Sequence, residues 1–555
     1  MQKQLLVAKK MTIAEKINHL RIECGLSQEE LAKFLAVSRQ SISKWEKGET
    51  LPQLEKIVEL ARFFRVSTDE LLDNQSPLKK NESTKTKGKR SYFGTDGFRG
   101  ESGAELTAHH AFLIGRFLGW YFSGPSFASR HPNGARAKIC IGKDARRSSY
   151  MLEYAISSGI AASGADAYIL HVTTTPSVSY VTRNEGFDCG VMITASHNAF
   201  YDNGIKILNS QGEKMEEDVT RLIEAYLDHD MEGLGLSGED DLPYAKKEKI
   251  GQVVDHVFGR NRYIGYLISC SATSFRDLKI GLDCANGSAW YIARSVFAAL
   301  GATLYVIGDH PDGLNENKGC GSTHIEELQK LVKENNLDVG FAFDGDADRC
   351  LAIDQDGSLI DGDKILYILA QRAKRHNRLP HDTVVSTIMS NSGLEKALSE
   401  IGMKNIQTKV GDRFVYEEMM KNDYWLGGEQ SGHIIIRKYA TTGDGILTAI
   451  KLTEEMIEQK ASLGKLSEAV HLYPQILKNV KVFDKSVVLE DEAIQNEARL
   501  INKELKGNGR LLLRESGTEP VIRIMVESDD LGECNRHIDR IYKIIQRKGY
   551  LDEAD

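Results

Sequence analysis

The sequence predicts an α/β protein of several domains, preceded by a small all-helical domain. The first observation is length, because 555 residues exceed what one hydrophobic core holds and suggest about four domains at roughly 150 residues each. The second is that short apolar runs alternate with helical patterns from Ser91 onward. Such alternation favours three strand–helix units and a smaller α+β segment, with active loops at the carboxyl ends of strands. The third is a purely helical pattern over residues 12–73.

Composition and charge are those of an ordinary globular protein. Hydrophobic residues make up 41% of the chain, charged residues 27%, and the net charge is −8. The eight cysteines form no Cys-x-x-Cys pair, so neither a zinc knuckle nor a disulfide framework is indicated. No stretch approaches the roughly 18 apolar residues that cross a bilayer. We therefore expect a cytoplasmic protein without membrane contact; Met11 is an alternative start, with residues 1–10 as an upstream extension.

Residues 11–73 are predicted to form a helix-turn-helix domain. Ser27-Gln-Glu-Glu30 is a capping box that opens a second helix, and Ser38 caps a third helix from which Ile42 and Trp45 point inward. This arrangement suits the polar face of the third helix to the DNA major groove. The segment resembles the Xre/Cro-type domain of phage repressors. The resemblance assigns DNA contact to Gln28, Arg39, Gln40, Ser41 and Lys44.

Two further segments follow in the same region. A second capping box at residues 67–70 predicts a fifth helix. Residues 74–90 hold six basic side chains against Glu82 alone and almost no apolar ones, which predicts a basic flexible linker. Such a linker favours DNA binding through phosphate contacts. The alternatives are a helical bundle whose polar face is only solvated, or a dimerisation module.

Three aspartates alternate directly after the apolar strand predicted at residues 339–343. Asp344, Asp346 and Asp348 are spaced so that their carboxylates can converge on one hard cation, which prefers oxygen ligands. An EF-hand is excluded, because its sixth position is Arg349 instead of glycine and its twelfth lacks the required glutamate. Three carboxylates with an open position suit Mg²⁺.

Ser196 follows another apolar strand end and is flanked by His197. The absence of a Gly-x-Ser-x-Gly elbow argues against an esterase triad. A serine at a loop tip is most often a cap or turn residue, but beside a metal it can be held as a phosphoserine. A later loop offers Glu429, Ser431 and His433, which suit sugar hydroxyls, although His433 is alternatively a structural histidine.

A phosphate-binding loop is predicted near the C-terminus. Its flanking cations are Arg514 and Arg523, and its centre is Ser516, Gly517 and Thr518. Hydroxyls, a glycine that permits close backbone approach and two guanidinium groups can form an anion cradle. The alternative is a turn with a surface salt bridge.

From Ser91 to the C-terminus the chain resembles the α-D-phosphohexomutase superfamily and, within it, the bacterial phosphoglucosamine mutases. The motifs that carry the resemblance are the serine and aspartate loops and residues 93–100, 320–323, 409–413, 427–433 and 514–520. It implies four domains around a central cleft, each contributing one loop. The expected boundaries are 91–245 for domain I with the phosphoserine, 246–354 for domain II with the metal loop, 355–470 for domain III with the sugar loop, and 471–555 for domain IV with the phosphate loop.

The resemblance also implies residue roles. Ser196 is the phosphorylated nucleophile and binds Mg²⁺ together with Asp344, Asp346 and Asp348. Arg99, Lys206 and Arg349 complete the catalytic group, with Lys206 a candidate general acid/base. Substrate contact falls to His197, Lys409, Glu429, Ser431, His433, Arg514, Ser516, Gly517, Thr518 and Arg523.

The activity so implied is the interconversion of glucosamine 6-phosphate and glucosamine 1-phosphate, a step toward cell-wall precursors. One Mg²⁺ per active site and glucosamine 1,6-bisphosphate as activator belong to it. Gln430 favours glucosamine, whereas Met there is typical of glucose or mannose mutases. Ala199 and Glu515 replace prolines usual in the family, which loosens their loops. The alternatives are a glucose or mannose phosphate mutase, or a sugar-phosphate-sensing regulator; we favour an enzyme that also binds duplex DNA, and a homodimer is compatible with both halves.

Overall fold

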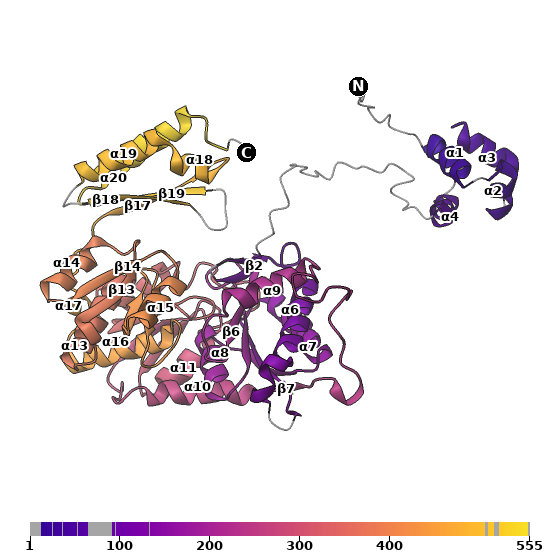
Figure 1. The fold of residues 1–555 in the computed structure, drawn as a ribbon. Coiled ribbons are helices and arrows are strands. Elements are labelled where there is room, and N and C mark those ends of the chain that lie inside the picture. Colours follow the sequence, from indigo (N-terminus) through magenta and orange to yellow (C-terminus); the bar gives the residue numbers. More distant parts are fainter. Residues whose placement is uncertain are drawn as a thin grey trace. The chain divides into compact units, whose positions relative to one another are not determined.

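The structure, a computed structural model, falls into two compact units, Met1–Lys89 and Arg90–Asp555 (Figure 1). The residues it describes are 13–24, 26–35, 37–52, 54–64, 92–94, 96–131, 134–505, 509–515 and 521–552. The predicted extension at residues 1–10, the helix opened at residues 67–70 and the linker at 74–90 lie outside them. Within the described residues, no helix is both long and apolar enough to cross a membrane.

The first unit is helical, as predicted. Its described helices are α1 (Ile13–Glu23), α2 (Gln28–Phe34), α3 (Arg39–Glu46) and α4 (Leu54–Phe64). Both halves of the capping box at Ser27 form, and the Ser38 hydroxyl accepts from the amide of Ser41 at the start of α3. Ile42 and Trp45 are buried among apolar side chains of all four helices. The predictions for this core and these two caps are confirmed.

The second unit contains four sheets, and we call the parts built on them domains I to IV; the domain boundaries given above stay predictions. Domain I holds a seven-stranded sheet in the order β1-β2-β6-β5-β3-β4-β7. Strands β3, β4, β5 and β7 are parallel, and β6 returns antiparallel to β5. Its elements are β1 (Phe93–Gly94), β2 (Gly97–Glu101), α6 (Ala108–Phe122), η1 (Pro125–Arg130), β3 (Lys138–Lys143), α7 (Arg147–Ala162), β4 (Asp166–Val172), α8 (Thr175–Asn184), β5 (Cys189–Ile193), β6 (Asp202–Asn209), α9 (Glu217–Leu227), η3 (Lys247–Lys249), β7 (Val253–Asp255) and α10 (Val257–Ser269).

Domains II and III repeat the strand–helix pattern with smaller sheets, in the orders β12-β11-β10-β8-β9 and β14-β13-β15-β16. The elements of domain II are β8 (Lys279–Asp283), α11 (Ala289–Ala299), β9 (Thr303–Ile307), α12 (Glu326–Asn335), β10 (Val339–Phe343), β11 (Cys350–Asp354) and β12 (Leu359–Ile360). Those of domain III are α13 (Gly362–Arg375), η4 (Pro380–Asp382), β13 (Thr383–Thr387), α14 (Ser392–Glu400), β14 (Lys404–Thr408), α15 (Asp412–Lys421), β15 (Leu426–Gly428), β16 (Ile434–Ile436), α16 (Gly445–Gln459) and α17 (Leu463–Leu466). The strand predicted at residues 339–343 is confirmed as β10, and so is the predicted alternation of strands and helices.

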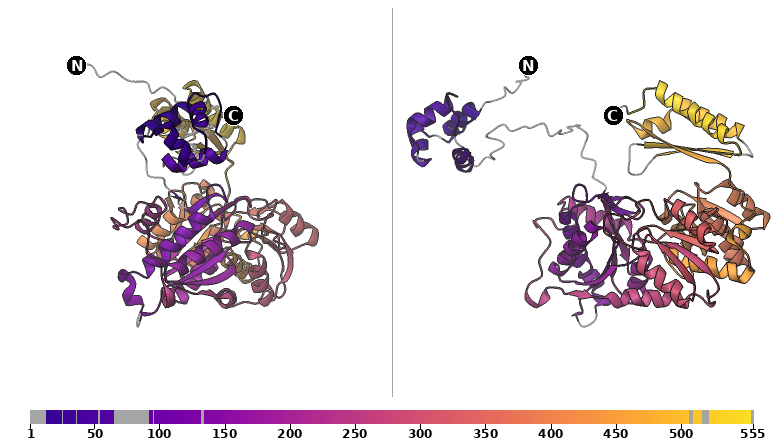
Figure 2. Two further views of the ribbon diagram at one scale, coloured as in Figure 1. Left: turned by 90° about the vertical axis from the view of Figure 1, so that its right-hand side faces the viewer. Right: turned by 180° about the vertical axis from the view of Figure 1, so that it is seen from behind.

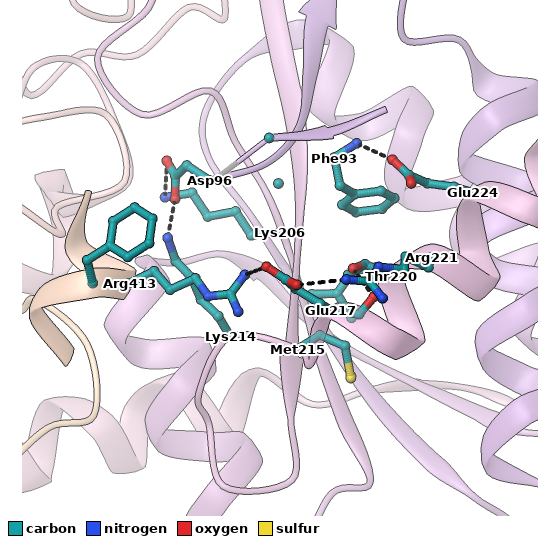
Figure 3. A pocket seen from close by; sticks show the side chains of 14 residues that line it. Phe93, Asp96, Lys206, Lys214, Met215, Glu217, Thr220, Arg221, Glu224 and Arg413 are labelled. Atoms are coloured by element: carbon teal, nitrogen blue, oxygen red, sulfur yellow. Dashed lines mark hydrogen bonds and ion pairs between the residues drawn. The ribbon is translucent and has the colours of Figure 1, made fainter. Parts of the chain in front are cut away.

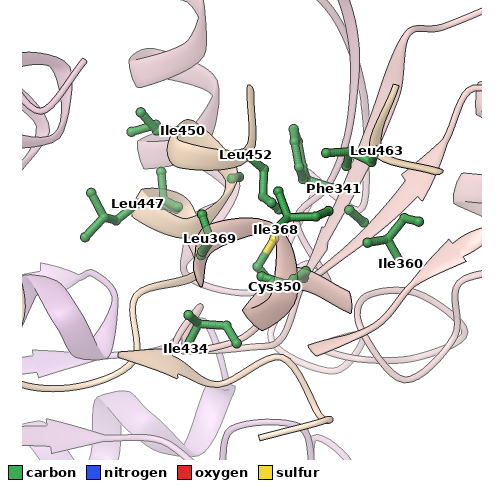
Figure 4. Close-up of a cluster of buried hydrophobic side chains, with 14 of the residues drawn as sticks. Phe341, Cys350, Ile360, Ile368, Leu369, Ile434, Leu447, Ile450, Leu452 and Leu463 are labelled. Carbon is green, nitrogen blue, oxygen red and sulfur yellow. The ribbon is translucent and has the colours of Figure 1, made fainter. Parts of the chain in front are cut away.

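Domains II and III share one hydrophobic core (Figure 4). Phe341 and Cys350 come from the domain II sheet, Ile434 comes from the domain III sheet, and Ile368 of α13 and Ile450 of α16 lie in the same cluster. Because one apolar cluster crosses both domains, the aspartate loop after β10 and the loop between β15 and β16 rest on a common support.

Domain IV is a three-stranded antiparallel sheet in the order β17-β19-β18, covered on one face by α19 and α20 (Figure 2). Its elements are β17 (Gln475–Lys481), α18 (Lys485–Glu490), α19 (Glu492–Glu504), β18 (Gly509–Glu515), β19 (Val521–Ser528) and α20 (Leu531–Arg547). It contacts domain III where the Ser392 amide donates to Glu527 Oε1 at 3.1 Å. This α+β arrangement is the one predicted for the C-terminal segment.

Candidate active site

Ser196 lies at the end of β5, whose five residues are all buried. Its side chain is buried, and its Oγ donates to Asp344 Oδ2 at 2.5 Å. Its backbone φ is +53°, a left-handed conformation that is uncommon for a residue other than glycine. Such a conformation persists where surrounding contacts hold it. The predicted nucleophile is therefore a fixed side chain that contacts the predicted metal cluster.

Two side chains that the sequence analysis did not single out hold the serine loop. Arg146 donates through Nη2 to the carbonyl oxygens of Ser196 and Asn198, both at 2.9 Å. Asn317 Nδ2 donates to the same Ser196 oxygen at 2.8 Å. Arg146 is fully buried, and its charge is balanced by Asp144, whose Oδ2 lies 2.8 Å from Nε. The only sequence signal for Arg146 is its place in the loop after β3, at the same sheet edge as Ser196.

The three aspartates after β10 converge, as their alternation predicts. Asp344, Asp346 and Asp348 are buried, and their nearest carboxylate oxygens all lie within 4.8 Å of one another. Asp346 Oδ1 is buried and has no hydrogen-bond partner among the described residues. Burial and the two neighbouring carboxylates raise the pKa of Asp344 well above its ordinary value. Crowded buried carboxylates with an unsatisfied oxygen fit a hard divalent cation.

Lys206 of β6 reaches the same cluster. Its Nζ lies 2.8 Å from Asp346 Oδ2 and 3.1 Å from Asp348 Oδ2. Burial by itself lowers the pKa of this lysine, but the carboxylates around it raise the pKa well above its ordinary value, so Nζ carries a proton at neutral pH. A cavity of about 500 Å³ opens beside Lys206 (Figure 3).

Arg99 and Arg349 border this group of charges. Arg99, on β2, forms an ion pair with Asp96 and has a buried Nε without a hydrogen-bond partner among the described residues. Arg349 follows the aspartate loop and lies 3.9 Å from Asp348 Oδ1. His197 is held neutral, because burial and then Arg349 and Arg99 lower its pKa to about 3. The structure thus brings all predicted catalytic residues to one place.

The predicted sugar loop connects β15 to β16. Glu429 Oε1 accepts from the amide of Gly411 at 3.0 Å, and Ser431 lies beside Glu429. His433 is buried, and its Nε2 accepts from the Gly443 amide at 3.0 Å. Burial alone lowers the pKa of His433, but Asp348, with Oδ1 3.7 Å from Nδ1, and Asp412, with Oδ2 3.6 Å from Nε2, raise it to about 9. The contact with Gly443 is a hydrogen bond only in the neutral form of the ring, with the proton on Nδ1. These contacts favour the structural alternative for His433.

The other predicted substrate residues are less fully placed. The side chain of Lys409 is exposed, in the turn before α15. Arg514 and Arg523 are direct cross-strand partners on β18 and β19. Burial, and then repulsion by Arg523, lowers the pKa of Arg514. An anion bound between the two guanidinium groups would relieve this repulsion. The centre of the predicted phosphate cradle, Ser516, Gly517 and Thr518, lies outside the described residues.

Comparisons with known proteins agree with this geometry. Four family descriptions match in order: phosphoglucomutase/phosphomannomutase alpha/beta/alpha domain I at residues 90–233, domain II at 261–357, domain III at 361–473 and the C-terminal domain at 477–544. A protein named phosphoglucosamine mutase from Lachnospira eligens is 55% identical over 459 residues, which are 83% of this chain and 99% of that relative. The chain belongs to the phosphoglucosamine mutase family. A relative of the same name from Lachnoclostridium phytofermentans is 51% identical over 83% of this chain and 99% of its own length.

Solved structures of the wider phosphohexomutase superfamily share the fold. A phosphoglucomutase/phosphomannomutase family protein from Burkholderia thailandensis matches with a TM-score of 0.66 and 20% identity, over 84% of this chain and 99% of its own. An N-acetylphosphoglucosamine mutase from Aspergillus fumigatus, in complex with GlcNAc-6P and magnesium, matches with a TM-score of 0.59 and 17% identity, over 83% and 97%. The predicted four-domain phosphohexomutase fold and the isomerase class, an intramolecular phosphotransferase, are confirmed.

A helix-turn-helix family description matches residues 17–71, which confirms the predicted N-terminal domain. Arg39, Gln40 and Lys44 are exposed along α3, as DNA contact requires. Ser41 shares its hydroxyl with Ser38 at 2.9 Å, and Gln28 donates to Glu46 Oε2 at 2.8 Å. Two of the five predicted DNA contacts are thus engaged within the domain.

Proposed function

We propose that this member of the family interconverts glucosamine 6-phosphate and glucosamine 1-phosphate through a phosphoserine at Ser196 and a 1,6-bisphosphate. The observation that carries the proposal is a cluster of three buried carboxylates, in which Asp344 accepts from a buried, conformationally fixed Ser196 while Asp346 and Asp348 pair with Lys206. The choice of glucosamine as the sugar rests on the names of two relatives that are 55% and 51% identical to this chain.

The residues perform the transfer mainly by positioning and charge neutralisation. The phosphoryl group leaves Ser196 Oγ for the free hydroxyl of the substrate, and the other phosphate of the bisphosphate later returns to Ser196. Lys206 is proposed as the general acid/base: its protonated Nζ gives a proton to Ser196 Oγ as the serine O–P bond breaks, and then takes the proton that the substrate hydroxyl loses as the new O–P bond forms. The return transfer runs the same exchange in reverse. Arg99 and Arg349 offset the charge of the transferring group.

Mg²⁺, one per active site, fits the three aspartates and Ser196, where it supplies Lewis-acid charge stabilisation to a phosphate oxygen. The magnesium complex of the Aspergillus fumigatus enzyme supports the choice of metal. Glucosamine 1,6-bisphosphate is proposed as activator, because it can transfer a phosphoryl group to an unphosphorylated Ser196.

Glu429 and Ser431 are proposed to bind sugar hydroxyls, while Arg514 and Arg523 hold the phosphate that is not transferred. Because the substrate presents either end to this second site, recognition there rests on charge instead of sugar shape. Glucose and mannose phosphates are the alternative substrates. Comparing kcat/KM for glucosamine, glucose and mannose 6-phosphates separates them.

The test is a coupled assay of glucosamine 6-phosphate turnover with Mg²⁺ and a trace of sugar bisphosphate. We expect turnover that EDTA abolishes and Mg²⁺ restores. Ser196→Ala should lose at least about 1,000-fold in kcat, because the covalent route is removed, while binding of glucosamine 6-phosphate by calorimetry persists. Absence of turnover on all three sugar phosphates, or near-native kcat in Ser196→Ala, contradicts the proposal.

We also propose that residues 12–73 bind duplex DNA. Arg39, Gln40 and Lys44 on one exposed face of α3 favour this function over a purely structural bundle. The helix is well supported, since Glu46 at its end accepts from Arg21 of α1 and from Gln28 of α2. The protein would then be both an enzyme and a DNA-binding protein.

A further inference from the structure

A chain of ion pairs runs from Lys206 to domain III, and Figure 3 shows its domain I part, in which Asp96 pairs with Lys206 and Lys214. Lys214, in the turn after β6, lies with its Nζ 3.1 Å from Asp96 Oδ1 and 2.7 Å from Asp412 Oδ1. Asp96 Oδ2 in turn lies 3.5 Å from Lys206 Nζ. Asp96, Lys206 and Lys214 belong to domain I, whereas Asp412 is the first residue of α15 in domain III.

Asp96 differs from the other carboxylates around Lys206. In the described part of the chain, the carboxylates within 4 Å of Lys206 Nζ belong to Asp346, Asp348 and Asp96. The first two are members of the proposed metal cluster, whereas Asp96 lies outside it and pairs with Arg99 and Lys214 as well as with Lys206. Gly97 brings Asp96 close, since a Cβ at this position would lie 2.5 Å from the Ile205 carbonyl oxygen, next to Lys206.

The other end of the chain touches the sugar loop. Gly411, with φ of +129°, precedes Asp412 and donates its amide to Glu429 Oε1 at 3.0 Å. The turn that fixes Glu429 therefore also presents the carboxylate that Lys214 binds. Lys214 and Asp412 are only partly buried, with side chains 27% and 16% exposed. Substituting them should therefore leave no cavity in a hydrophobic core.

We propose that Lys214 and Asp412 are positioning residues for the transfer step, which hold Lys206, through Asp96, at a fixed place relative to the sugar loop. This inference rests on the proposed function. Neither residue is assigned to substrate or metal. Their pairing links the proton-donating group of domain I to the loop of domain III that is proposed to bind the sugar. Displacement of a catalytic group by about 1 Å costs on the order of 100-fold in rate, so the link should act on kcat.

The experiment measures kcat and KM for glucosamine 6-phosphate in Lys214→Met, Asp412→Asn and the double variant. We expect each single variant to lose about 10- to 100-fold in kcat with KM changed by less than about threefold, because the lost interaction positions the reacting groups and not the bound sugar. The double variant should lose no more than Asp412→Asn alone, since both substitutions break the Lys214–Asp412 link and Asp412→Asn also alters the contact of Asp412 Oδ2 with His433 Nε2 at 3.6 Å. Lys214→Arg, which keeps the charge, should recover most of the loss.

A matched control separates positioning from simple joining of domains. Arg413 Nη1 and Glu217 Oε1, 2.7 Å apart, form a second ion pair between α15 and α9 that does not touch Asp96 or Lys206. Glu217→Gln should therefore leave kcat within about twofold. If Glu217→Gln lowers kcat as much as Lys214→Met does, the two pairs act only as tethers and the inference is overturned.

Two other outcomes contradict the inference. One is a Lys214→Met variant, folded by circular dichroism, with kcat within about twofold of wild type. The other is single-variant losses that multiply in the double variant, which would mean that Lys214 and Asp412 act independently. Absence of turnover in the wild-type chain overturns the proposed function instead, so the two failures are distinguishable.

Discussion

At the scale of single residues, Arg146 holds the serine loop in its conformation. Its planar guanidinium group donates to carbonyl oxygens of Ser196, Asn198 and Asp202 from a fully buried position. A planar fork makes several directed hydrogen bonds at once, which a lysine cannot reproduce. The loop depends on it the more because Ala199, unlike the family's usual proline, does not restrict φ.

We predict that Arg146→Lys lowers kcat by about 100-fold, because Ser196 Oγ moves from its place near Asp344. Arg147→Lys is the control, since the neighbouring side chain is exposed and the same substitution there should be silent. The measurements are kcat in the coupled assay and the phosphorylated fraction of Ser196 by intact mass. Wild-type kcat in Arg146→Lys would show that Asn317 alone holds the loop.

At the scale of elements, the beginning of α13 contains a buried acid that opposes folding at high pH. Asp361 caps the helix, and Asp363 accepts from the amide of Asn391 at 2.7 Å, near the start of α14. Burial, and then Asp361, raises the pKa of Asp363 to about 8. Because this value lies above that of the unfolded chain, the stability contributed by the protonated carboxyl is fully present below about pH 4. It is lost as the pH rises through 8.

We therefore predict that Asp363→Asn, which keeps the hydrogen bond from Asn391, unfolds at a temperature about 2–4 °C higher than wild type at pH 8. The difference should shrink toward pH 5, where the wild-type carboxyl is protonated in the folded state. Thermal unfolding followed by circular dichroism at both pH values checks this. A difference that does not change with pH would mean that Asp363 does not titrate in this range.

At the scale of the whole molecule, two compact units carry two separate proposals. The 459 residues that match Lachnospira eligens phosphoglucosamine mutase make up 83% of this chain and 99% of that relative, so that relative has no room for a counterpart of residues 12–73. The three aspartates predicted to bind the metal, Lys206 and the predicted sugar loop all lie in the second unit. Catalysis should therefore not require the first.

We predict that a protein starting at Ser91 keeps kcat within about twofold, because every predicted catalytic and substrate residue is retained. The full-length protein should bind duplex DNA taken from upstream of its own gene at low salt. This binding should weaken as the salt concentration rises, since lysine and arginine side chains displace counterions from the DNA. Lys44→Ala should weaken this binding and leave kcat unchanged. A full-length protein that retains no duplex at low salt would refute the DNA-binding proposal.

The sequence by itself determined the local features. The caps at Ser27 and Ser38, the strands before Ser196 and Asp344, and the spacing of the aspartates follow from hydrogen-bonding preferences and periodicity within about ten residues. Family motifs then assigned the chemistry. For this reason the predicted fold is confirmed, and the predicted catalytic residues meet in one place.

Only the tertiary structure decided which distant side chains support that place. Arg146 and Asn317 meet at Ser196 from positions 50 and 121 residues away, and Lys214 meets Asp412 across 198 residues. Charged and polar side chains of these types are common along the chain. No periodic pattern in the sequence distinguishes the few that come together in the folded protein. Their roles arise from burial, which makes a charge depend on its partners, and burial is set by how the sheets pack together.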